Sequence, residues 1–371
     1  MIYKENSVNV NNLSFSYAEI SSGIYKNQGL TEYLEKTLDF CKDWLSGKEK
    51  FTISTSGSTG NPKIIEISAE QIKVSAQMTI KALGLKPNDK ALVCLNTSYI
   101  AGMMMLVRGM VGKLSLNIIE PISNPFLNLD PFYIPVDFVA LVPLQLSAAL
   151  SDPDSRKKLL KVKSIIIGGA PVTATLEDEC KNLPSAIYET YGMTETVSHI
   201  ALRRLNGPER SNCFKVLPGV EIDTDSRECL KIRGALTNYE WLITNDKVKL
   251  VDHKTFEWLG RVDNVINSGG IKIQTESLEK KIFPMLKKLN INHQFFIASL
   301  PHPTLGEAII LFLEGKDSVS GIEILNKEFS EKLNKYEVPK EVIFLKNFNQ
   351  TPTGKIQRKE TMKKYLNQNR K

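Results

Sequence analysis

One segment rich in glycine and hydroxyl residues, STSGSTGNPK at residues 54–63, contains the residue types that bind phosphate. Gly57 and Gly60 permit close backbone approach, so consecutive N–H groups can face an anion. The Ser and Thr hydroxyls add donors, and Lys63 adds a cation. The spacing is not that of the Walker loop GxxxxGK[ST], because the glycines are too close together and Pro62 precedes the lysine. The segment predicts a phosphate-binding loop, with a plain surface hairpin as the alternative.

A second segment, YETYGMTETVSHI at residues 188–200, combines aromatic, hydroxyl and acidic side chains. Glu195 could coordinate Mg²⁺, which prefers carboxylate and phosphate oxygens together. Tyr191 could stack on a flat base, and Thr194 could donate to a phosphate or a carboxylate. Just before it, SIIIGGAPV (164–172) predicts a buried strand ending in a turn, where ligands commonly bind. A solvated helix start is the alternative for the first segment, and taken alone a plain strand end explains the second segment equally well.

Two later segments carry further candidates. Asp246, in TNDKV, could bind ribose hydroxyls, and Arg261 could reach the same sugar or a phosphate. An ion pair at the surface is the alternative for these two. Near the C-terminus, NQTPTGKIQR (349–358) predicts a tight Pro–Thr–Gly turn that projects Lys355 toward a reacting centre, unless it is only a solvated basic tail.

The surrounding pattern predicts how these segments are held. FTIST (51–55) predicts a strand that leads into the phosphate loop, and Ser68 with Gln71 predicts a capping box at the start of the next helix. Between residues 51 and 200, apolar β-branched segments that end in Pro or Gly alternate with helical segments, which predicts an α/β fold with a mainly parallel, helix-covered sheet. Residues 216–259 alternate as short strands and predict an antiparallel sheet or distorted barrel. A small α+β unit follows, so we expect domains at 1–260 and 261–371.

The composition argues against several classes of protein. The 371 residues are 42% hydrophobic and 24% charged, as in ordinary globular proteins. The net charge of +7 is spread along the chain, apart from a basic tail at 358–371, and does not predict nucleic-acid binding. Five cysteines without a CxxC pair argue against a disulfide framework or a zinc site. The polar N-terminus has no signal-peptide core, and the apolar segment 100–111 is too short to span a membrane. We therefore expect a cytoplasmic protein; its oligomeric state is not indicated.

Taken in order, these segments resemble the acyl-adenylate-forming superfamily of acyl- and aryl-CoA ligases, luciferases and peptide-synthetase adenylation domains. TSGSTGNPK resembles its phosphate loop, YGMTET its adenine and Mg²⁺ segment, TND its ribose motif, GRVDNVINSGG its hinge and PTGKIQR its catalytic-lysine loop. LPHPTLGEAI (300–309) resembles the strand pair of its C-terminal domain, and the resemblance covers about residues 51–360.

The resemblance implies a two-step reaction in which ATP and a carboxylate form an acyl-adenylate that the CoA thiol then attacks. It implies Lys355 and Thr194 as catalytic residues, Glu195 as the Mg²⁺ ligand and Asp263 as the hinge about which a mobile C-terminal domain rotates. The remaining residues implied to bind ATP or CoA are Thr55, Ser56, Gly57, Ser58, Thr59, Gly60, Lys63, Gly169, Ala170, Pro171, Tyr191, Gly192, Met193, Asp246, Arg261, Gly270 and Lys272.

Within the superfamily, ETVSHIALR, ALVPLQL and IAGMMMLVRGMVG resemble segments of the o-succinylbenzoate–CoA ligases of menaquinone (vitamin K2) biosynthesis. That acid carries an aromatic ring and a second carboxylate that is not activated, so its site needs an apolar wall and a buried cation or donor. Arg108 fits this need because a charge in an apolar helix requires a partner, although a structural acid or solvent would also satisfy it. The implied acid-binding residues are Tyr99, Arg108, Ser198 and His199.

Other functions stay open at this stage. Another aryl- or acyl-CoA ligase, or an adenylation enzyme that loads a carrier protein, would share the same motifs. The Walker-type spacing of a P-loop kinase or GTPase is absent, and a non-catalytic nucleotide-binding protein would have no need for Lys355. Three features depart from the superfamily pattern: a short segment before the phosphate loop, which predicts a reduced N-terminal lobe, Tyr99 in place of His, and Asn245 in place of the glycine of TGD.

Overall fold

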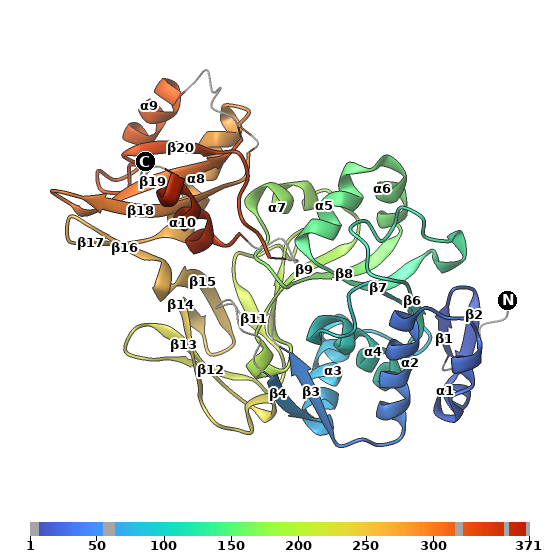
Figure 1. Cartoon of the computed structure of the whole chain (residues 1–371). Helices are drawn as coiled ribbons and strands as arrows, with labels where there is room; N and C mark the ends of the chain where they lie inside the picture. The colour runs from blue at the N-terminus through green and yellow to red at the C-terminus, as the bar shows by residue number, and fades with distance from the viewer. Residues whose placement is uncertain (1–6, 55–63, 292, 316–321, 352–355, 369–371) are drawn as a thin grey trace. The chain divides into compact units, whose positions relative to one another are not determined.

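The computed structural model describes the whole chain except residues 1–6, 55–63, 292, 316–321, 352–355 and 369–371. Its described residues form two compact units (Figure 1). Unit 1 comprises residues 1–222, 232–242 and 253–255, and unit 2 comprises residues 223–231, 243–252 and 256–371. The domain boundary at residue 261 remains a prediction.

Unit 1 is built on a mixed sheet with the strand order β11-β10-β9-β8-β7-β5-β6-β1-β2. The neighbouring pairs from β9 to β1 are parallel, whereas the β9–β10, β10–β11 and β1–β2 pairs are antiparallel. This confirms the predicted α/β class with a largely parallel sheet. The strands are β1 (Ser7–Val10), β2 (Leu13–Ser16), β5 (Lys90–Val93), β6 (Ser115–Ile118), β7 (Val136–Leu141), β8 (Val162–Ile167), β9 (Ala186–Gly192), β10 (His199–Arg204) and β11 (Phe214–Val216).

The helices of unit 1 are connected to this sheet by short loops (Figure 1). The predicted capping box is present, because Gln71 N donates to Ser68 Oγ at 3.2 Å and Ser68 N donates to Gln71 Oε1 at 3.2 Å. Gly84, with φ +62°, ends the same helix. The helices are α1 (Tyr17–Ser22), α2 (Glu32–Leu45), α3 (Ala69–Leu83), α4 (Ile100–Gly112), α5 (Pro143–Ser151), α6 (Pro153–Leu159) and α7 (Ala174–Cys180).

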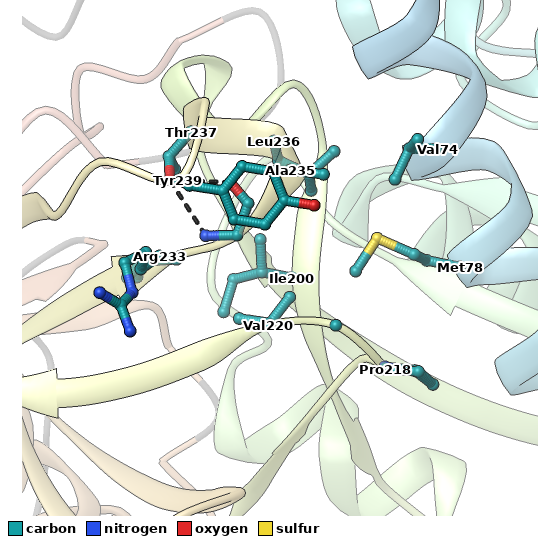
Figure 2. Close-up of a pocket in the computed structure, with 13 residues that line it drawn as sticks. Val74, Met78, Ile200, Pro218, Val220, Arg233, Ala235, Leu236, Thr237 and Tyr239 are labelled. Atoms are coloured by element: carbon teal, nitrogen blue, oxygen red, sulfur yellow. Dashed lines mark hydrogen bonds between the residues drawn. The ribbon is translucent and has the colours of Figure 1, made fainter.

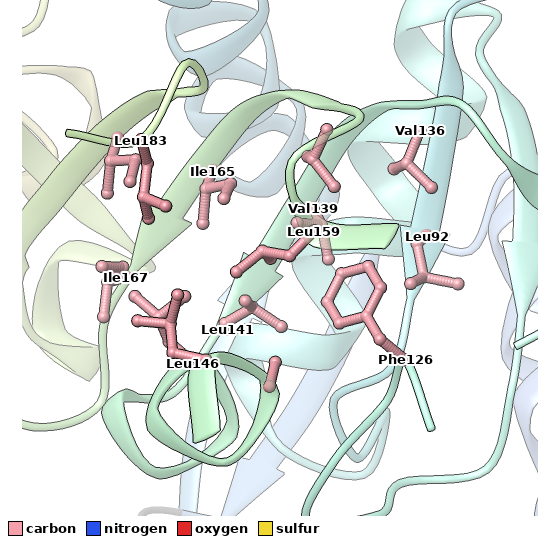
Figure 3. Packing of buried hydrophobic residues seen from close by; sticks show 14 of the residues in the cluster. Leu92, Phe126, Val136, Val139, Leu141, Leu146, Leu159, Ile165, Ile167 and Leu183 are labelled. Atoms are coloured by element: carbon pink, nitrogen blue, oxygen red, sulfur yellow. The ribbon is translucent and has the colours of Figure 1, made fainter. Parts of the chain in front are cut away.

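Buried apolar side chains fix the central strands of this sheet. Figure 3 shows Val139 and Leu141 of β7 and Ile165 and Ile167 of β8 packed with Leu146 of α5, and all of them are buried. Burial of each such side chain contributes about 1.5–3 kcal/mol relative to exposure. The strands that end next to the candidate site are therefore held in a rigid core.

A separate hairpin brackets residues 55–63. Strand β3 (Lys50–Ser54) pairs antiparallel with β4 (Ile64–Ser68), and Ser54 lies opposite Ile64. The sequence predicted β3 but not β4, because IIEIS is short and runs directly into the cap of α3. The predicted phosphate loop connects these paired strands and lies outside the described residues.

Unit 2 contains a second sheet with the order β17-β16-β19-β18, in which β20 pairs with β19. The strand pair predicted for LPHPTLGEAI (300–309) is present. This segment contains the end of β18 and the start of β19, which pair antiparallel from Phe295↔Leu313 to His302↔Gly306. The elements are β16 (Val265–Ser268), β17 (Ile271–Gln274), β18 (Phe295–His302), β19 (Gly306–Glu314), β20 (Glu341–Leu345), α8 (Thr275–Lys288), α9 (Ile322–Lys332) and α10 (Arg358–Gln368). This confirms the predicted small α+β region.

Four more strands follow one another in chain order between residues 221 and 261. Only residues 253–254 join the last two, and so short a connection requires antiparallel neighbours. They are β12 (Glu221–Thr224), β13 (Cys229–Arg233), β14 (Leu242–Asp252) and β15 (Thr255–Arg261). In the part of the chain that the structure describes, no helix is long and apolar enough to cross a membrane.

Candidate active site

The carboxyl ends of β8 and β9 bring two predicted segments together. The strands are parallel with Ile167 opposite Glu189, so the segments that follow them leave from the same edge of the sheet. Thr190 Oγ1 donates to Ile167 O at 3.0 Å, and a Cβ on Gly168 would lie only 2.5 Å from that hydroxyl. The turn Gly169–Pro171, in which Gly169 has φ +82°, therefore begins in close contact with the strand that carries Tyr191.

Gly192 ends β9 at a point where two backbones touch. A Cβ there would lie 2.4 Å from His199 Cα and 2.4 Å from Ser198 O, so no other residue fits. This explains the glycine of YGMTET independently of any ligand. It also fixes the return strand β10 directly against the end of β9.

A strained turn separates Glu195 from Ser198. Residues 194–196 form one turn of 3₁₀ helix, and Val197 then adopts φ +63° and ψ −57°. Ser198 N donates to Thr196 O at 2.6 Å, which completes a γ-turn of the rare, strained kind. A β-branched residue in this conformation costs on the order of 1–3 kcal/mol, and such strain gathers at functional sites. The turn reverses the chain between the predicted metal ligand and the predicted acid-binding residues.

Glu195 is exposed and available as a ligand, whereas Thr194 is partly buried. The described residues contain no group of three or more His, Cys, Asp or Glu arranged to hold a metal. Mg²⁺ bound to a nucleotide needs no such group, since one or two carboxylates suffice when phosphates supply the other ligands. The single carboxylate of Glu195 therefore fits the predicted role.

A buried polar cluster joins α3, α4 and β10. Arg108, only 2% exposed, donates from Nη2 to Ser198 Oγ at 2.9 Å and lies 3.5 Å from His199 Nδ1. His199 Nε2 lies 3.1 Å from Thr79 Oγ1, which in turn donates to Ser75 O at 3.2 Å. The structure thus brings together Arg108, Ser198 and His199, which the sequence predicted as acid-binding residues. Thr79 was not predicted.

The hydrogen bonds assign one tautomer to His199. Because the Thr79 hydroxyl donates to a carbonyl, it accepts from His199 Nε2, and Nδ1 is then free to accept from Arg108. Burial, reinforced by the charge of Arg108, holds the pKa of His199 well below its usual range. His199 is therefore a neutral acceptor beside a cation.

Burial of the Arg108 charge costs free energy, and no acidic side chain of the described residues compensates for it. Among the described residues, no carboxylate pairs with its guanidinium, and its Nε has no hydrogen-bond partner. Burial lowers the pKa of Arg108 to about 9. Neither alternative from the sequence applies, since the side chain reaches neither solvent nor a structural acid within the described chain.

Tyr99 does not join this cluster. It caps the N-terminus of α4, nine residues before Arg108, which corresponds to about 14 Å along a helix. It is also 49% exposed. The structure therefore separates Tyr99 from the other three predicted acid-binding residues.

Unit 2 brings together the predicted ribose residues. Asp246 is buried, and its Oδ1 accepts from Trp258 Nε1 at 3.2 Å and lies 3.7 Å from Arg261 Nη1. Arg261 Nη2 also pairs with Asp263 Oδ2 at 3.0 Å. Asn245, at the position of the motif glycine, accepts from Arg227 Nη1 at 3.1 Å. The ion pairs that the sequence offered as the alternative are thus present.

Gly269 and Gly270 form the two-residue turn between β16 and β17, with φ +59° and +83°. Two successive positive φ values require glycine or asparagine, so this turn explains the glycines structurally. Lys272, opposite Asn267 in β17, is exposed.

Eight predicted residues cannot be placed, because they lie outside the described part of the chain: Thr55, Ser56, Gly57, Ser58, Thr59, Gly60, Lys63 and Lys355. The chain on either side of residues 352–355 is paired. Gln350 forms a β-bridge with Ile356, and Gln357 N donates to Asn349 O at 2.8 Å.

A cavity of about 270 Å³ lies elsewhere in unit 1 (Figure 2). Val74 and Met78 of α3, Ile200 of β10 and Val220 are among its apolar lining residues, and Tyr239 lies across it. Among the predicted site residues that the structure describes, none lines it. Met78 and Ile200 are the chain neighbours of Thr79 and His199, so the cavity lies next to the buried cluster.

The parallel sheet, with a glycine turn after β8 and the YGMTET segment that starts at the end of β9, fits the class of acyl-adenylate-forming enzymes. A sequence model of the AMP-binding enzyme family matches residues 50–230. An acyl-CoA synthetase (AMP-forming)/AMP-acid ligase II-like protein from Dyadobacter fermentans is 40% identical, with 94% of this chain and 98% of that chain covered and a TM-score of 0.65. The chain belongs to the AMP-binding enzyme family and is an acid–CoA ligase.

Two further relatives share less sequence identity with this chain. A 2-succinylbenzoate–CoA ligase of Lactococcus lactis is 25% identical, over 91% of this chain and 79% of that protein. An O-succinylbenzoate coenzyme A synthetase from Bacillus subtilis, solved with ATP and magnesium, is 20% identical, with 84% of this chain and 69% of that chain covered and a TM-score of 0.67. At that identity the second comparison supports the fold alone.

Proposed function

We propose that this ligase activates o-succinylbenzoate and transfers it to CoA in the cytoplasm, as a step of menaquinone biosynthesis. The relatives named as 2-succinylbenzoate–CoA ligases support this choice of acid. Because these relatives are only 24–25% identical, the choice of acid has to be supported by the residues of the site.

The observation that carries the proposal is the buried, uncompensated charge of Arg108. A buried cation without a partner is costly, whereas an acid with a second carboxylate would supply both a counter-ion and hydrogen-bond acceptors. Two uncharged side chains lie beside Arg108: the Ser198 hydroxyl and the neutral His199 ring. Both would be next to the second carboxylate of the acid. An acid with only one carboxylate would leave Arg108 unpaired once that carboxylate is activated.

The other residues have roles in this proposal that follow from their chemistry. The turn Gly169–Pro171 and Tyr191 form two walls for the adenine ring, and Glu195 holds Mg²⁺. Asp246, fixed by Trp258, accepts from the ribose hydroxyls. Bound ATP with Mg²⁺ supplies an activated α-phosphorus and neutralises charge as the carboxylate attacks.

Further roles rest on resemblance. Thr194 donates to the reacting carboxylate or phosphate, and Lys355 places a cation at the reacting centre. Residues 55–63 bind the β- and γ-phosphates. Asp263 is the hinge, while Gly270 and Lys272 contact CoA. Residues 1–260 and 261–371 act as the two domains.

A panel of acids tests the choice of substrate. Purified protein is given ATP, Mg²⁺ and one acid, and pyrophosphate release is measured with and without CoA. We expect o-succinylbenzoate to give a higher kcat/KM than either 4-oxo-4-phenylbutanoate, which lacks the ring carboxylate, or benzoates without the succinyl arm. Activity only with such benzoates would exclude the proposal. If the acid stimulates pyrophosphate release but no thioester forms when CoA is added, the result would instead favour an enzyme that loads a carrier protein.

A further inference from the structure

An ion network around the buried pair Arg203 and Glu189 contacts both proposed adenine walls and was not anticipated from the sequence. Arg203 of β10 lies opposite Glu189 of β9 and donates from Nε to Glu189 Oε2 at 2.8 Å. Its Nη2 also donates to Glu177 Oε2 at 2.9 Å, and Arg210 closes the network on Glu177 Oε1 at 2.9 Å. Arg203 and Glu189 are each 9% exposed.

This network positions the first of the two proposed walls, the turn Gly169–Pro171. The second carboxylate oxygen of Glu189, Oε1, accepts from Val172 N at 3.0 Å. Val172 directly follows the turn Gly169–Pro171, so Glu189 ties the end of that turn to β9. Burial opposes the charge of Arg203, but Glu189 and Glu177 outweigh it and raise the pKa of Arg203. Glu189 is thus held by hydrogen bonds at both carboxylate oxygens, from Val172 N and from Arg203 Nε.

Arg203 also positions the second proposed wall, the ring of Tyr191. Its guanidinium lies 5.8 Å from the ring centroid of Phe214, close enough for a cation–π contact. The Phe214 ring in turn packs against the ring of Tyr191, with centroids 5.7 Å apart and planes inclined by 59°. Tyr191 and Glu189 are two residues apart on β9, so their side chains share the face of the sheet on which Arg203 lies.

We propose that Arg203 is a positioning residue that sets the distance between the two walls of the adenine site, through Glu189 on one side and Phe214 on the other. This rests on the proposed function only in assigning these walls to adenine. Arg203 makes its contacts to protein groups, and it acts on the nucleotide through the turn Gly169–Pro171 and the Tyr191 ring. A Lys at this position would keep the charge but lose the fork that binds two carboxylates at once.

Direct binding measurements test this inference without any acid present. Calorimetry gives the Kd for AMP, which needs both walls, and the Kd for magnesium pyrophosphate, which needs neither. We expect Arg203→Lys to raise the Kd for AMP about tenfold, as is usual when a positioning partner is removed, and to leave pyrophosphate binding unchanged. Phe214→Leu, which leaves the ion network intact, should give a smaller rise in the same direction.

The neighbouring arginine provides a matched control. Arg204 faces the other side of β10, where it lies 4.8 Å from the ring of Tyr188 and donates to Asn206 O at 2.9 Å. Arg204→Lys should leave the Kd for AMP unchanged. Wild-type affinity for AMP in both Arg203→Lys and Phe214→Leu would overturn the inference, as would an equal loss of AMP and pyrophosphate binding. Because no acid is used, failure of the o-succinylbenzoate proposal in the acid panel would leave this result unaffected.

Discussion

Replacement of Arg108 by Met should make the protein more stable and less active. Burial lowers the pKa of Arg108 to about 9, so at about 1.4 kcal/mol for each pH unit the buried charge costs on the order of a few kcal/mol. This cost is fully present below pH 9 and decreases as the pH rises above 9, because the folded state then binds fewer protons than the unfolded state. Relaxation reduces the gain, so we expect Arg108→Met to raise the free energy of unfolding by about 1–4 kcal/mol at pH 7.

The same replacement removes the proposed partner of the second carboxylate. Loss of one member of a buried charge pair costs about 2–5 kcal/mol of binding, so kcat/KM for o-succinylbenzoate should fall by about 30- to several thousand-fold. For 4-oxo-4-phenylbutanoate, which has no second carboxylate, the change should be small. In our proposal, Arg108 is a site residue whose function is maintained at the expense of stability.

Urea denaturation and pyrophosphate release measure the two effects on the same preparations. Arg156→Met, on an exposed position of α6, is the control for the loss of an arginine and should change neither quantity. A destabilised Arg108→Met protein would show that the charge is compensated in the folded state, and the reasoning from burial would then be wrong. An equal loss of activity toward both acids would show that Arg108 does not distinguish them.

Two further predictions concern unit 2. Lys355→Ala should slow adenylation by at least about a hundredfold while CoA attack on supplied acyl-adenylate stays near the wild-type rate; a parallel loss in both half-reactions would contradict separate roles for the two steps. Glu279 accepts from Ile297 N at 2.7 Å and from Arg358 Nη2 at 2.8 Å, and burial, which Arg358 only partly offsets, raises its pKa to about 7. The folded state then holds a proton that the unfolded state releases, so stability should fall between pH 4.5 and 7. Glu279→Gln should flatten this decline in urea titrations, and an unchanged slope would exclude Glu279 as its source.

The sequence predicted those parts of the fold that local patterns determine. The β-branched segments that end in Pro or Gly are the central strands β7 and β8, and the Ser68–Gln71 capping box begins α3 as predicted. Strand β4 was missed because five residues between a loop and a helix cap carry too little periodicity to be recognised. Its pairing with β3 depends on a tertiary contact.

Sequence motifs proposed most residues of the candidate site, whereas residues that depend on tertiary contacts were missed. Arg108 was identified because a charge within an apolar helix is conspicuous in sequence. Thr79 reaches His199 across 120 residues, and no spacing rule indicates such a contact. Arg203 resembles any strand arginine until its register opposite Glu189 is known. Tyr99 was placed in the acid site by resemblance, yet the length of α4 separates it from Arg108.

The γ-turn at Val197 has a consequence for how new specificities can arise. The proposed metal ligand Glu195 and the proposed acid-binding residue Ser198 lie on one short segment, so their spacing depends on local backbone geometry. Arg108, which selects the acid in our proposal, comes from α4, a different element. A lineage could therefore exchange residues on α4 to accept another acid while the spacing between Glu195 and Ser198 is inherited intact.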